Sequence, residues 1–265
     1  MSVRTTVVQV NCSDAESPET RVERVLAQLD EFEGKTDLIL LPELWNTGAF
    51  NLEACRVVAQ PIDGPLPTAL GEKARKLGAW IHGGSFCERD GDSLFNTSLL
   101  FNPAGDLVAT YRKVHVFTYA REQDTMTPGD RYVVVNTPLG LTGLATCYDL
   151  RFPEMFRAMR EQGAQAFLIA SGWPTRRITQ WSSLLPARAI ENQAWVVANN
   201  QVGTQGQLVL GGNSAVIDPL GVEVARGGEA ETTLEVQIDP GAAATWRSEF
   251  PANDDVVSRP VEVIS

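Results

Sequence analysis

The sequence has little histidine, and its cysteines are not clustered. The two histidines, His82 and His115, stand in separate segments, and neither has a histidine four residues away or a cysteine pair beside it. Metal sites usually need such closely spaced ligands, so we expect no metal and interpret both histidines as packing residues. The four cysteines lie far apart without a CxxC pair, which favours reduced thiols over a disulfide framework: Cys12, Cys55, Cys87 and Cys147.

Positive charge and long apolar runs are also scarce. There are 22 Lys and Arg residues against 33 Asp and Glu residues, which gives a formal net charge of −11 and no basic stripe for nucleic acid. No apolar run approaches the roughly 18–20 residues of a membrane span, and MSVRTTVVQV at the start lacks the core of a signal peptide. We therefore expect a soluble, cytoplasmic protein that binds neither nucleic acid nor membrane.

No stretch rich in Gly, Ser or Pro divides the chain. Its 265 residues are 43% hydrophobic and 21% charged, which is the composition of an ordinary globular protein. We therefore predict a single domain over residues 1–265.

The two halves of the chain repeat one pattern. Residues 96–111 and 213–227 each contain two apolar runs around an Asn/Asp-Pro-x-Gly turn and are predicted hairpins. Matched positions are 116 apart, as from Ser98 to Ser214. A strand precedes each hairpin, at 79–86 and 194–203. Earlier strands at 37–43 and 166–173, after helical stretches at 19–33 and 153–162, have a larger offset that implies an insertion between them.

Near-continuous apolar strands bounded by helices indicate sheets that helices cover. Two such halves would pack sheet on sheet, so we predict an α/β fold with a four-layer α-β-β-α sandwich and two pseudo-symmetric halves. A doubly wound single sheet is the alternative that the strand pattern leaves open.

Polar residues follow three apolar runs, where active sites of α/β proteins gather. In LATCYDLRFPE, at 144–154, Cys147 ends a strand and Pro153 begins a helix. Such an elbow can expose a nucleophile while the N–H of Tyr148 faces a bound carbonyl. Taken alone, Cys147 could equally be a buried, inert thiol.

A thiol needs a base or a cation nearby to become a nucleophile. Glu43, directly after the run LILLP, is the predicted base, and Lys113 is the predicted cation. Each could instead be an exposed, solvated residue. A Cys-His pair that uses His82 or His115 is a weaker alternative, because spacing identifies no third orienting residue.

Together these segments resemble the nitrilase superfamily of carbon-nitrogen hydrolases. Nearly the whole chain carries the resemblance, through LLPE, YRKVH, CYDLRFPE, RAIENQ and GGNSAVIDPLG in that order. The resemblance implies the same sandwich fold and a catalytic set of Glu43, Lys113 and Cys147. It also implies a second glutamate, Glu122, which would orient Lys113 or the substrate.

The resemblance implies acyl transfer without a metal or organic cofactor. Glu43 would take the proton of Cys147, the thiolate would attack an amide carbon, and Lys113 with the Tyr148 N–H would hold the oxyanion. Glu43 would then protonate the departing ammonia and activate the water that hydrolyses the thioester. We expect Asp149, Arg151 and Glu154 to brace the elbow through local ion pairs and hydrogen bonds.

SGWPTRRITQW, at 171–181, resembles the omega-amidase branch, whose members hydrolyse 2-oxoglutaramate. In that reading Trp173 lines the pocket and Arg177 pairs with the substrate carboxylate, unless Arg177 is a structural residue. The ending at 247–260 departs from the basic, aromatic ending of that branch. The resemblance also implies a homodimer.

Other functions stay open at this point. Within the enzyme class they are a deaminated-glutathione or general aliphatic amidase, then an N-carbamoyl hydrolase or a nitrilase. A catalytically silent interaction protein on the same fold is the alternative from another class.

Overall fold

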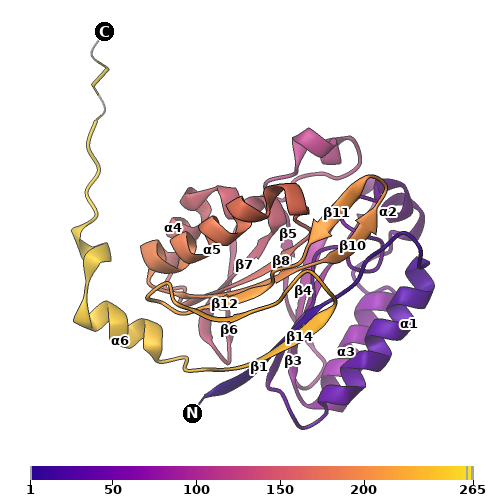
Figure 1. Ribbon diagram of the computed structural model, residues 1–265, viewed down its shortest axis with the longest axis horizontal. Helices are drawn as coiled ribbons and strands as arrows, with labels where there is room; N and C mark the ends of the chain where they lie inside the picture. Colours follow the sequence, from indigo (N-terminus) through magenta and orange to yellow (C-terminus); the bar gives the residue numbers. More distant parts are fainter. Residues whose placement is uncertain (1, 261, 264–265) are drawn as a thin grey trace.

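The chain folds into four layers, with two six-stranded β-sheets packed face to face and helices on both outer faces (Figure 1). The fold is described from a computed structural model for residues 2–260, 262 and 263. The predicted α-β-β-α sandwich is confirmed, and the alternative of one doubly wound sheet is excluded. No helix in this part of the chain is long and apolar enough to cross a membrane.

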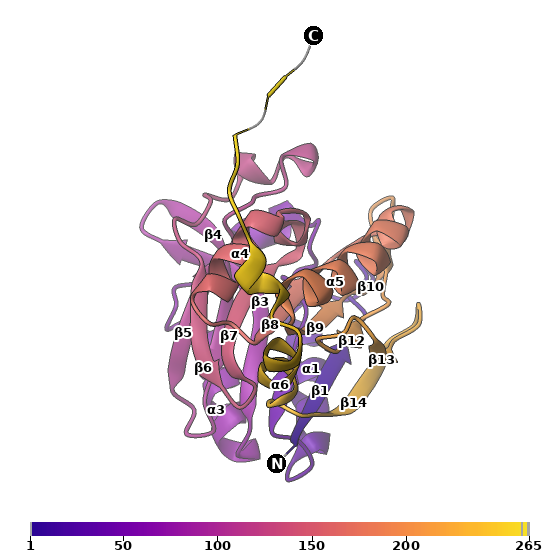
Figure 2. The same ribbon diagram turned by 90° about the vertical axis from the view of Figure 1, so that its left-hand side faces the viewer.

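The two large sheets share one plan (Figure 2). In each, three neighbouring strands run parallel and the other pairings are antiparallel. The first sheet has the order β14-β1-β2-β3-β4-β5, with β1 (Val3–Gln9), β2 (Leu38–Leu40), β3 (Trp80–Asp90), β4 (Ser93–Phe101), β5 (Leu107–Arg112) and β14 (Thr232–Ile238). The second has the order β13-β12-β9-β8-β7-β6, with β6 (Val133–Thr137), β7 (Gly140–Thr146), β8 (Ala166–Ser171), β9 (Trp195–Asn200), β12 (Ala215–Ile217) and β13 (Glu223–Arg226).

The predicted hairpins are β4–β5 and β12–β13, at equivalent places in the two sheets. Helices α1 (Pro18–Leu29) and α3 (Pro65–Leu77) lie on the first sheet, and α4 (Pro153–Glu161) and α5 (Ile178–Asn192) lie on the second (Figure 1). The first half has one more helix, α2 (Leu52–Val58), between β2 and β3. This helix accounts for the insertion that the larger offset implied. The remaining elements are the hairpin of β10 (Val202–Gln205) and β11 (Leu208–Gly211), and the helix α6 (Ala242–Glu249).

Local sequence fixes where the outer helices start. Ser17 caps α1 by accepting a hydrogen bond from the N–H of Thr20, and Pro18 takes the first helical position. Pro153 does the same for α4, and thereby ends the elbow that follows β7. Both helices therefore begin at the edge of the sheet where β1 and β7 end.

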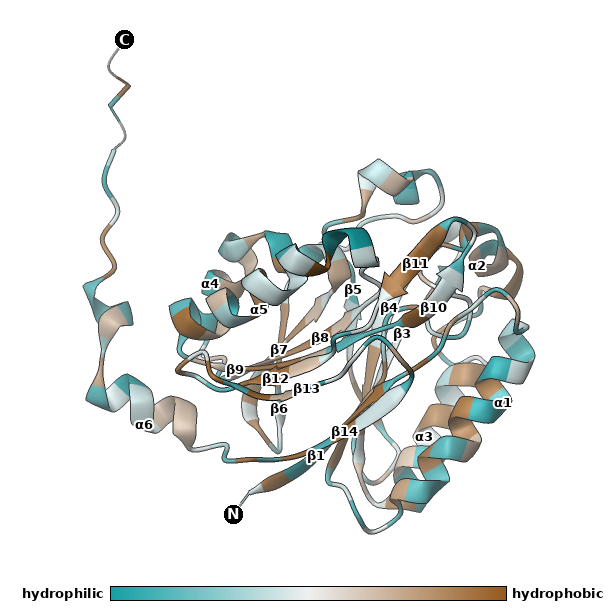
Figure 3. Ribbon diagram, viewed as in Figure 1, coloured by the Kyte–Doolittle hydropathy of each residue, from teal (hydrophilic) through white to brown (hydrophobic). Residues whose placement is uncertain are grey.

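Successive side chains of a strand point to opposite faces of the sheet, so the apolar residues of the first sheet belong to two cores. In the first sheet, Val7 and Leu40 face the second sheet, while Val8 and Ile39 face α1 and α3. The strands are accordingly brown through the middle of the molecule, and the outer helices alternate brown and teal (Figure 3). The core that contains Val7 and Leu40 joins the two halves, and the core that contains Val8 and Ile39 joins the first sheet to its helices; burial of apolar surface stabilises both by about 25 cal/mol per Å².

Buried amides join the two sheets directly. Asn199, on β9, donates to the carbonyl oxygens of Val8 and Leu40 at 2.8 and 2.7 Å. Ser214 donates its hydroxyl to the Oε1 atom of Gln9 at 2.7 Å. The strand β14 then pairs with β1, so the end of the chain completes the first sheet.

Candidate active site

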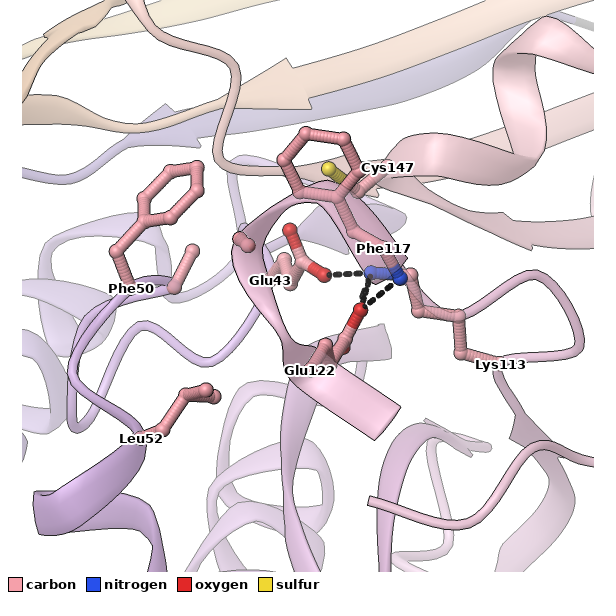
Figure 4. A pocket seen from close by; sticks show the side chains of 9 residues that line it. Glu43, Phe50, Leu52, Lys113, Phe117, Glu122 and Cys147 are labelled. Atoms are coloured by element: carbon pink, nitrogen blue, oxygen red, sulfur yellow. Dashed lines mark hydrogen bonds and ion pairs between the residues drawn. The ribbon is translucent and has the colours of Figure 1, made fainter. Parts of the chain in front are cut away.

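Loops from both halves bring the four predicted catalytic residues together (Figure 4). Glu43 follows β2, Lys113 follows β5, and Cys147 follows β7. Glu122 comes from a short 3-10 turn, Glu122–Asp124. Together with apolar side chains, these four residues line one pocket.

The elbow at Cys147 has the predicted shape. The strand β7 ends at Thr146, and a 3-10 turn, Cys147–Arg151, leads to α4. Cys147 has a φ of 51°, in the left-handed region that L residues seldom occupy. As the second residue of this turn, Tyr148 has an N–H without a partner inside the helix, and this N–H is free for a ligand.

Backbone strain is concentrated at this site. Of the five non-glycine residues with positive φ in the described chain, three adjoin or belong to it: Leu44, Arg121 and Cys147. Leu44 follows Glu43, and Arg121 precedes Glu122. Such conformations cost free energy and persist where the surroundings enforce them, which is common at functional sites.

Lys113 lies between the two glutamates. Its Nζ atom is 2.8 Å from Oε1 of Glu43 and 3.1 and 3.0 Å from the two carboxylate oxygens of Glu122. Lys113 and Asn96 both bond Oε1 of Glu43 and leave its Oε2 atom, which lies on the side of Cys147 (Figure 4). One carboxylate oxygen is therefore held by the lysine, and the other is free to accept a proton.

Burial and these charges set the proton affinities. Burial raises the pKa of Glu43, and the Glu122 carboxylate adds to the rise against the opposing Lys113 ammonium. Burial would also raise the pKa of Glu122, but Lys113 and the Phe117 N–H outweigh it and lower that pKa. Burial disfavours charged Lys113, yet the two carboxylates hold its pKa well above the usual value. Burial and the Glu43 carboxylate raise the pKa of the Cys147 thiol well above the usual value, so the resting thiol is protonated.

A second lobe opens on the other side of Cys147. It is lined by aromatic rings and two arginines. The Arg177 guanidinium stacks 5.0 Å from the centre of the Phe117 ring and has no ion pair with any described residue. Trp173 is buried and donates its indole N–H to the carbonyl oxygen of Cys147 at 3.2 Å. Trp173 and Arg177 thus both line this lobe, and Arg177 forms no structural ion pair among the described residues.

The three remaining elbow residues behave differently from one another. Asp149 is buried and accepts hydrogen bonds from the Thr146 N–H at 2.8 Å and the Tyr111 hydroxyl at 2.7 Å, so its bracing role is confirmed. Arg151 forms no ion pair within the described chain and stacks 4.7 Å from the centre of the Trp173 ring, inside the second lobe. Glu154 is exposed and has no ion pair among the described residues, so that part of the prediction is wrong.

Neither histidine is hydrogen-bonded to Cys147 in the part of the chain described. His115 bonds Asp149 at 2.7 Å and stacks on Phe152 at 3.8 Å between ring centres. His82 is buried in β3 and its Nδ1 atom accepts the N–H of Gly84. The Cys-His alternative is therefore excluded, and both histidines pack against neighbours as predicted.

The sequence did not point to three residues of this site. Asn96, on β4, is buried and bonds both Glu43 and Glu122. Phe50 and Phe117 line both lobes. Asn96 is the first residue of the repeat that predicted the hairpin, but nothing in its spacing indicated a contact with the glutamates. The two phenylalanines lie in loops whose positions depend on tertiary contacts.

Comparisons with known proteins agree with this arrangement. The family model for carbon-nitrogen hydrolases matches residues 4–248. A 2-oxoglutaramate amidase from Paenarthrobacter nicotinovorans is 38% identical over 94% of this chain and 87% of its own. A deaminated glutathione amidase from Yersinia enterocolitica is 33% identical over 91% of this chain and 88% of its own.

The fold has solved relatives as well. The crystal structure of a CN-hydrolase superfamily protein from Xanthomonas campestris, with an arsenic adduct in its active site, superposes with a TM-score of 0.91. The two sequences are 33% identical, and the match covers 99% of this chain and 100% of that one. The resemblance found in the sequence is thereby confirmed: the chain belongs to the carbon-nitrogen hydrolase family.

Proposed function

We propose that the protein is a thiol amidase that cleaves the C–N bond of a small carboxylate-bearing amide, with 2-oxoglutaramate as the preferred substrate, and releases ammonia. One observation carries the proposal. Cys147 lies where a lobe with Glu43 and Lys113 meets a lobe that contains an unneutralised Arg177. The first lobe suits the reacting amide, and the second suits an anionic acyl group.

The reaction starts with proton transfer from the Cys147 thiol to Oε2 of Glu43, the carboxylate oxygen without a partner. The thiolate attacks the amide carbon, and the C=O electron pair moves onto oxygen. Lys113 and the Tyr148 N–H stabilise that oxyanion. The raised pKa of Glu43 suits a base that must hold this proton through the attack.

Glu43 then passes the proton to the amide nitrogen. The C–N bond breaks, ammonia leaves, and the acyl group stays on Cys147 as a thioester. Glu43 next removes a proton from water, whose oxygen attacks the thioester carbon. The second tetrahedral species collapses to the free acid and the thiol, which restores the starting state.

Glu122 acts on Lys113 rather than on substrate. Both of its carboxylate oxygens lie within 3.1 Å of Nζ of Lys113, and Oε2 also accepts the N–H of Phe117 at 2.5 Å. These hydrogen bonds fix the position of the Glu122 carboxylate, and the carboxylate keeps Lys113 charged. Its assigned role is therefore to orient Lys113.

The second lobe supports the choice of acyl group. Arg177 has no acidic partner in the described chain, which as a whole carries an excess of acidic residues. A guanidinium that faces a pocket in this way is suited to bidentate binding of a carboxylate. The 2-oxoglutaramate amidase relative supports the same substrate.

A second arginine in this lobe keeps one alternative open. Arg151 also lines it, so the lobe presents two cations. Deaminated glutathione carries two carboxylates, and a relative bears that activity in its name. Simple aliphatic amides, N-carbamoyl compounds and nitriles lack a carboxylate for these arginines and are weaker candidates.

Formation of the carboxylic acid product across a panel of these compounds tests the proposal, because 2-oxoglutaramate releases ammonia whereas deaminated glutathione releases a dipeptide. We expect kcat/KM for 2-oxoglutaramate to exceed that for deaminated glutathione and for uncharged amides. Arg177→Gln should raise KM for 2-oxoglutaramate about 10- to 100-fold, because a charged hydrogen bond contributes about 1.5–3 kcal/mol. Arg176→Gln, a change at the exposed neighbouring arginine, is the matched control. If Arg177→Gln kept the preference for 2-oxoglutaramate over uncharged amides, the assigned role would be contradicted, and a catalytically silent protein would form no acid from any compound.

We also propose that residues 1–265 act as one domain, that the protein is a homodimer, and that it works in the cytoplasm. Both sheets contribute residues to the same pocket, which supports the single domain. A reducing compartment keeps the nucleophilic thiol in its active form. Light scattering at micromolar concentration tests the dimer, and a monomeric mass would refute it.

A further inference from the structure

The buried amide of Asn96 holds the two glutamates of the site together. Asn96 lies on β4, and its Nδ2 atom donates to Oε1 of Glu43 at 2.8 Å and to Oε1 of Glu122 at 3.1 Å. Its backbone oxygen accepts the N–H of Lys113 at 2.9 Å. One residue thus contacts all three charged residues, which lie far apart in the sequence.

The orientation of this amide is determined by its neighbours. Two carboxylate oxygens face the Nδ2 atom, and carboxylates only accept, so the NH₂ end must point at them. The Oδ1 atom is then buried and accepts no hydrogen bond from the described residues. Native structures rarely leave such an atom unsatisfied, and where they do a functional reason is common.

A count of donors shows why the amide matters to the reaction. The Lys113 ammonium has three hydrogens, and in the resting site three carboxylate oxygens lie within 3.1 Å of Nζ. Stabilisation of an oxyanion next to Cys147 requires Lys113 to weaken one of these contacts. The contact to Glu43 is the one that weakens, because Glu43 becomes neutral when it takes the thiol proton.

At that moment Asn96 is the remaining donor to Oε1 of Glu43. Its Nδ2 hydrogen bond does not depend on the charge of Lys113, and the strand β4 fixes its position. The Oε2 atom therefore continues to face Cys147 and the leaving nitrogen.

We propose that Asn96 is a positioning residue that fixes Oε1 of Glu43, so that Oε2 serves as the proton-carrying oxygen while Lys113 turns to the oxyanion. This inference rests on the proposed function, since it assigns no separate reaction to the site. It adds one residue on which the geometry of the base depends.

Asn96→Ala and Asn96→Asp test the inference, and Thr97→Val is the matched control. Thr97 is the next residue of β4 and is also buried, but its hydroxyl bonds Glu88, away from the site. We expect both Asn96 variants to lower kcat roughly 10- to 100-fold, as misplacement of a reacting group by about 1 Å does, and to change KM less than about threefold. Thr97→Val should keep the wild-type pH profile even if it lowers thermal stability.

The pH profile separates a positioning role from a structural one. The amide N–H groups stabilise charged Glu43, so their loss in Asn96→Ala should raise its pKa further. The acidic limb of kcat/KM should then move to higher pH by about one unit. A wild-type pH profile in Asn96→Ala, or a kcat within about twofold of the wild type, would overturn the inference.

Alkylation of Cys147 gives a readout that does not depend on the substrate. The rate of iodoacetamide labelling, followed by peptide mass spectrometry against pH, should show the same upward shift of its acidic limb in Asn96→Ala. If no amide were hydrolysed but this shift occurred, the proposed substrate would be wrong and the role of Asn96 would stand. If the wild type hydrolysed the amide as proposed but Asn96→Ala showed no shift of the acidic limb, the role of Asn96 would be wrong and the proposed function would stand.

Discussion

The two halves of the molecule share one topology but contribute different chemistry. Loops of the first sheet supply the charged set of Glu43, Lys113 and Glu122, whereas the second sheet supplies Cys147 and the arginine-lined lobe. The loops after β2 and β8 occupy equivalent places and meet at the site. One carries Glu43, and the other carries Gly172, where an added Cβ would lie 3.4 Å from Oε2 of Glu43 and 2.3 Å from the Cβ of Ala49. The two copies of the repeated scaffold thus differ at equivalent places, where one provides a carboxylate and the other a glycine that leaves room for Ala49.

Removal of the nucleophile from the second half should have the largest effect. We expect Cys147→Ala to lower kcat at least about 10⁴-fold, because no other group can form the thioester. Ammonia release measures the loss, and intact mass measures the missing acyl adduct. Cys55→Ala, at a buried cysteine outside the pocket, should stay near the wild type. Substantial activity in Cys147→Ala would mean that the second half does not supply the nucleophile.

Neutralisation of Glu43, the proposed base in the first half, should have the next largest effect on kcat. We expect Glu43→Gln to lower kcat about 10²- to 10⁴-fold, the usual range for general acid-base catalysis. The same change removes one of the causes that raise the pKa of Cys147, so the thiolate should appear at lower pH in an ultraviolet titration. The cysteine would then ionise more easily and yet react more slowly with substrate. If kcat and thiol ionisation rose together, Lys113 alone would suffice to activate the thiol.

The hydrogen bonds between the two sheets can be removed without a change to any residue that lines the pocket. Asn199→Ala should lower the free energy of unfolding by about 2–4 kcal/mol, since it leaves two buried carbonyl oxygens, those of Val8 and Leu40, without their donor. Urea unfolding measures this. Asn253→Ala, which removes one partly buried side-chain bond to Gln193, should cost less than about 1 kcal/mol. Equal losses in the two variants would show that Asn199 does not join the sheets.

The smallest effect concerns acidic residues near the starts of α1 and α4. Glu16 is paired with Arg24 at 2.9 Å, and this contact lowers its pKa, whereas Glu154 is unpaired among the described residues. Glu16→Gln should cost about 1 kcal/mol after allowance for partial exposure, and Glu154→Gln should cost nothing measurable. The pKa of Glu16 is lower in the folded protein than its ordinary value of 4.5. The stability lost in Glu16→Gln should therefore be largest above pH 4.5 and should disappear as the pH falls through the pKa of the folded state. A pH-independent difference would argue against the ion pair.

Much of this arrangement could be predicted from the sequence because it depends on local pattern. The repeated hairpins gave the two sheets, and apolar runs that end in Glu43 and Cys147 gave two site residues together with their strands. Lys113 was also predicted from the residues as the cation, whereas Glu122 required the family resemblance, since nothing in its spacing fixes a contact.

The errors and omissions have a common physical cause. Glu154 was expected to pair because it follows the nucleophile closely, but the first turn of α4 points it to solvent. Asn96 was missed because its partners lie 53 and 26 residues away, on loops that only the folded sheet brings close. Contacts across such distances depend on tertiary packing, which local pattern does not encode.

The pairing of β14 with β1 has a consequence for synthesis of the chain. Val3 is registered against Ile238, so the first sheet lacks its edge strand β14 until residues 232–238 have been made. The loops after β2 and β5 of that sheet carry Glu43 and Lys113. We expect a nascent chain on the ribosome to keep the first half in a loose, chaperone-accessible state, and its thiol to gain reactivity only after the C-terminal strand has emerged.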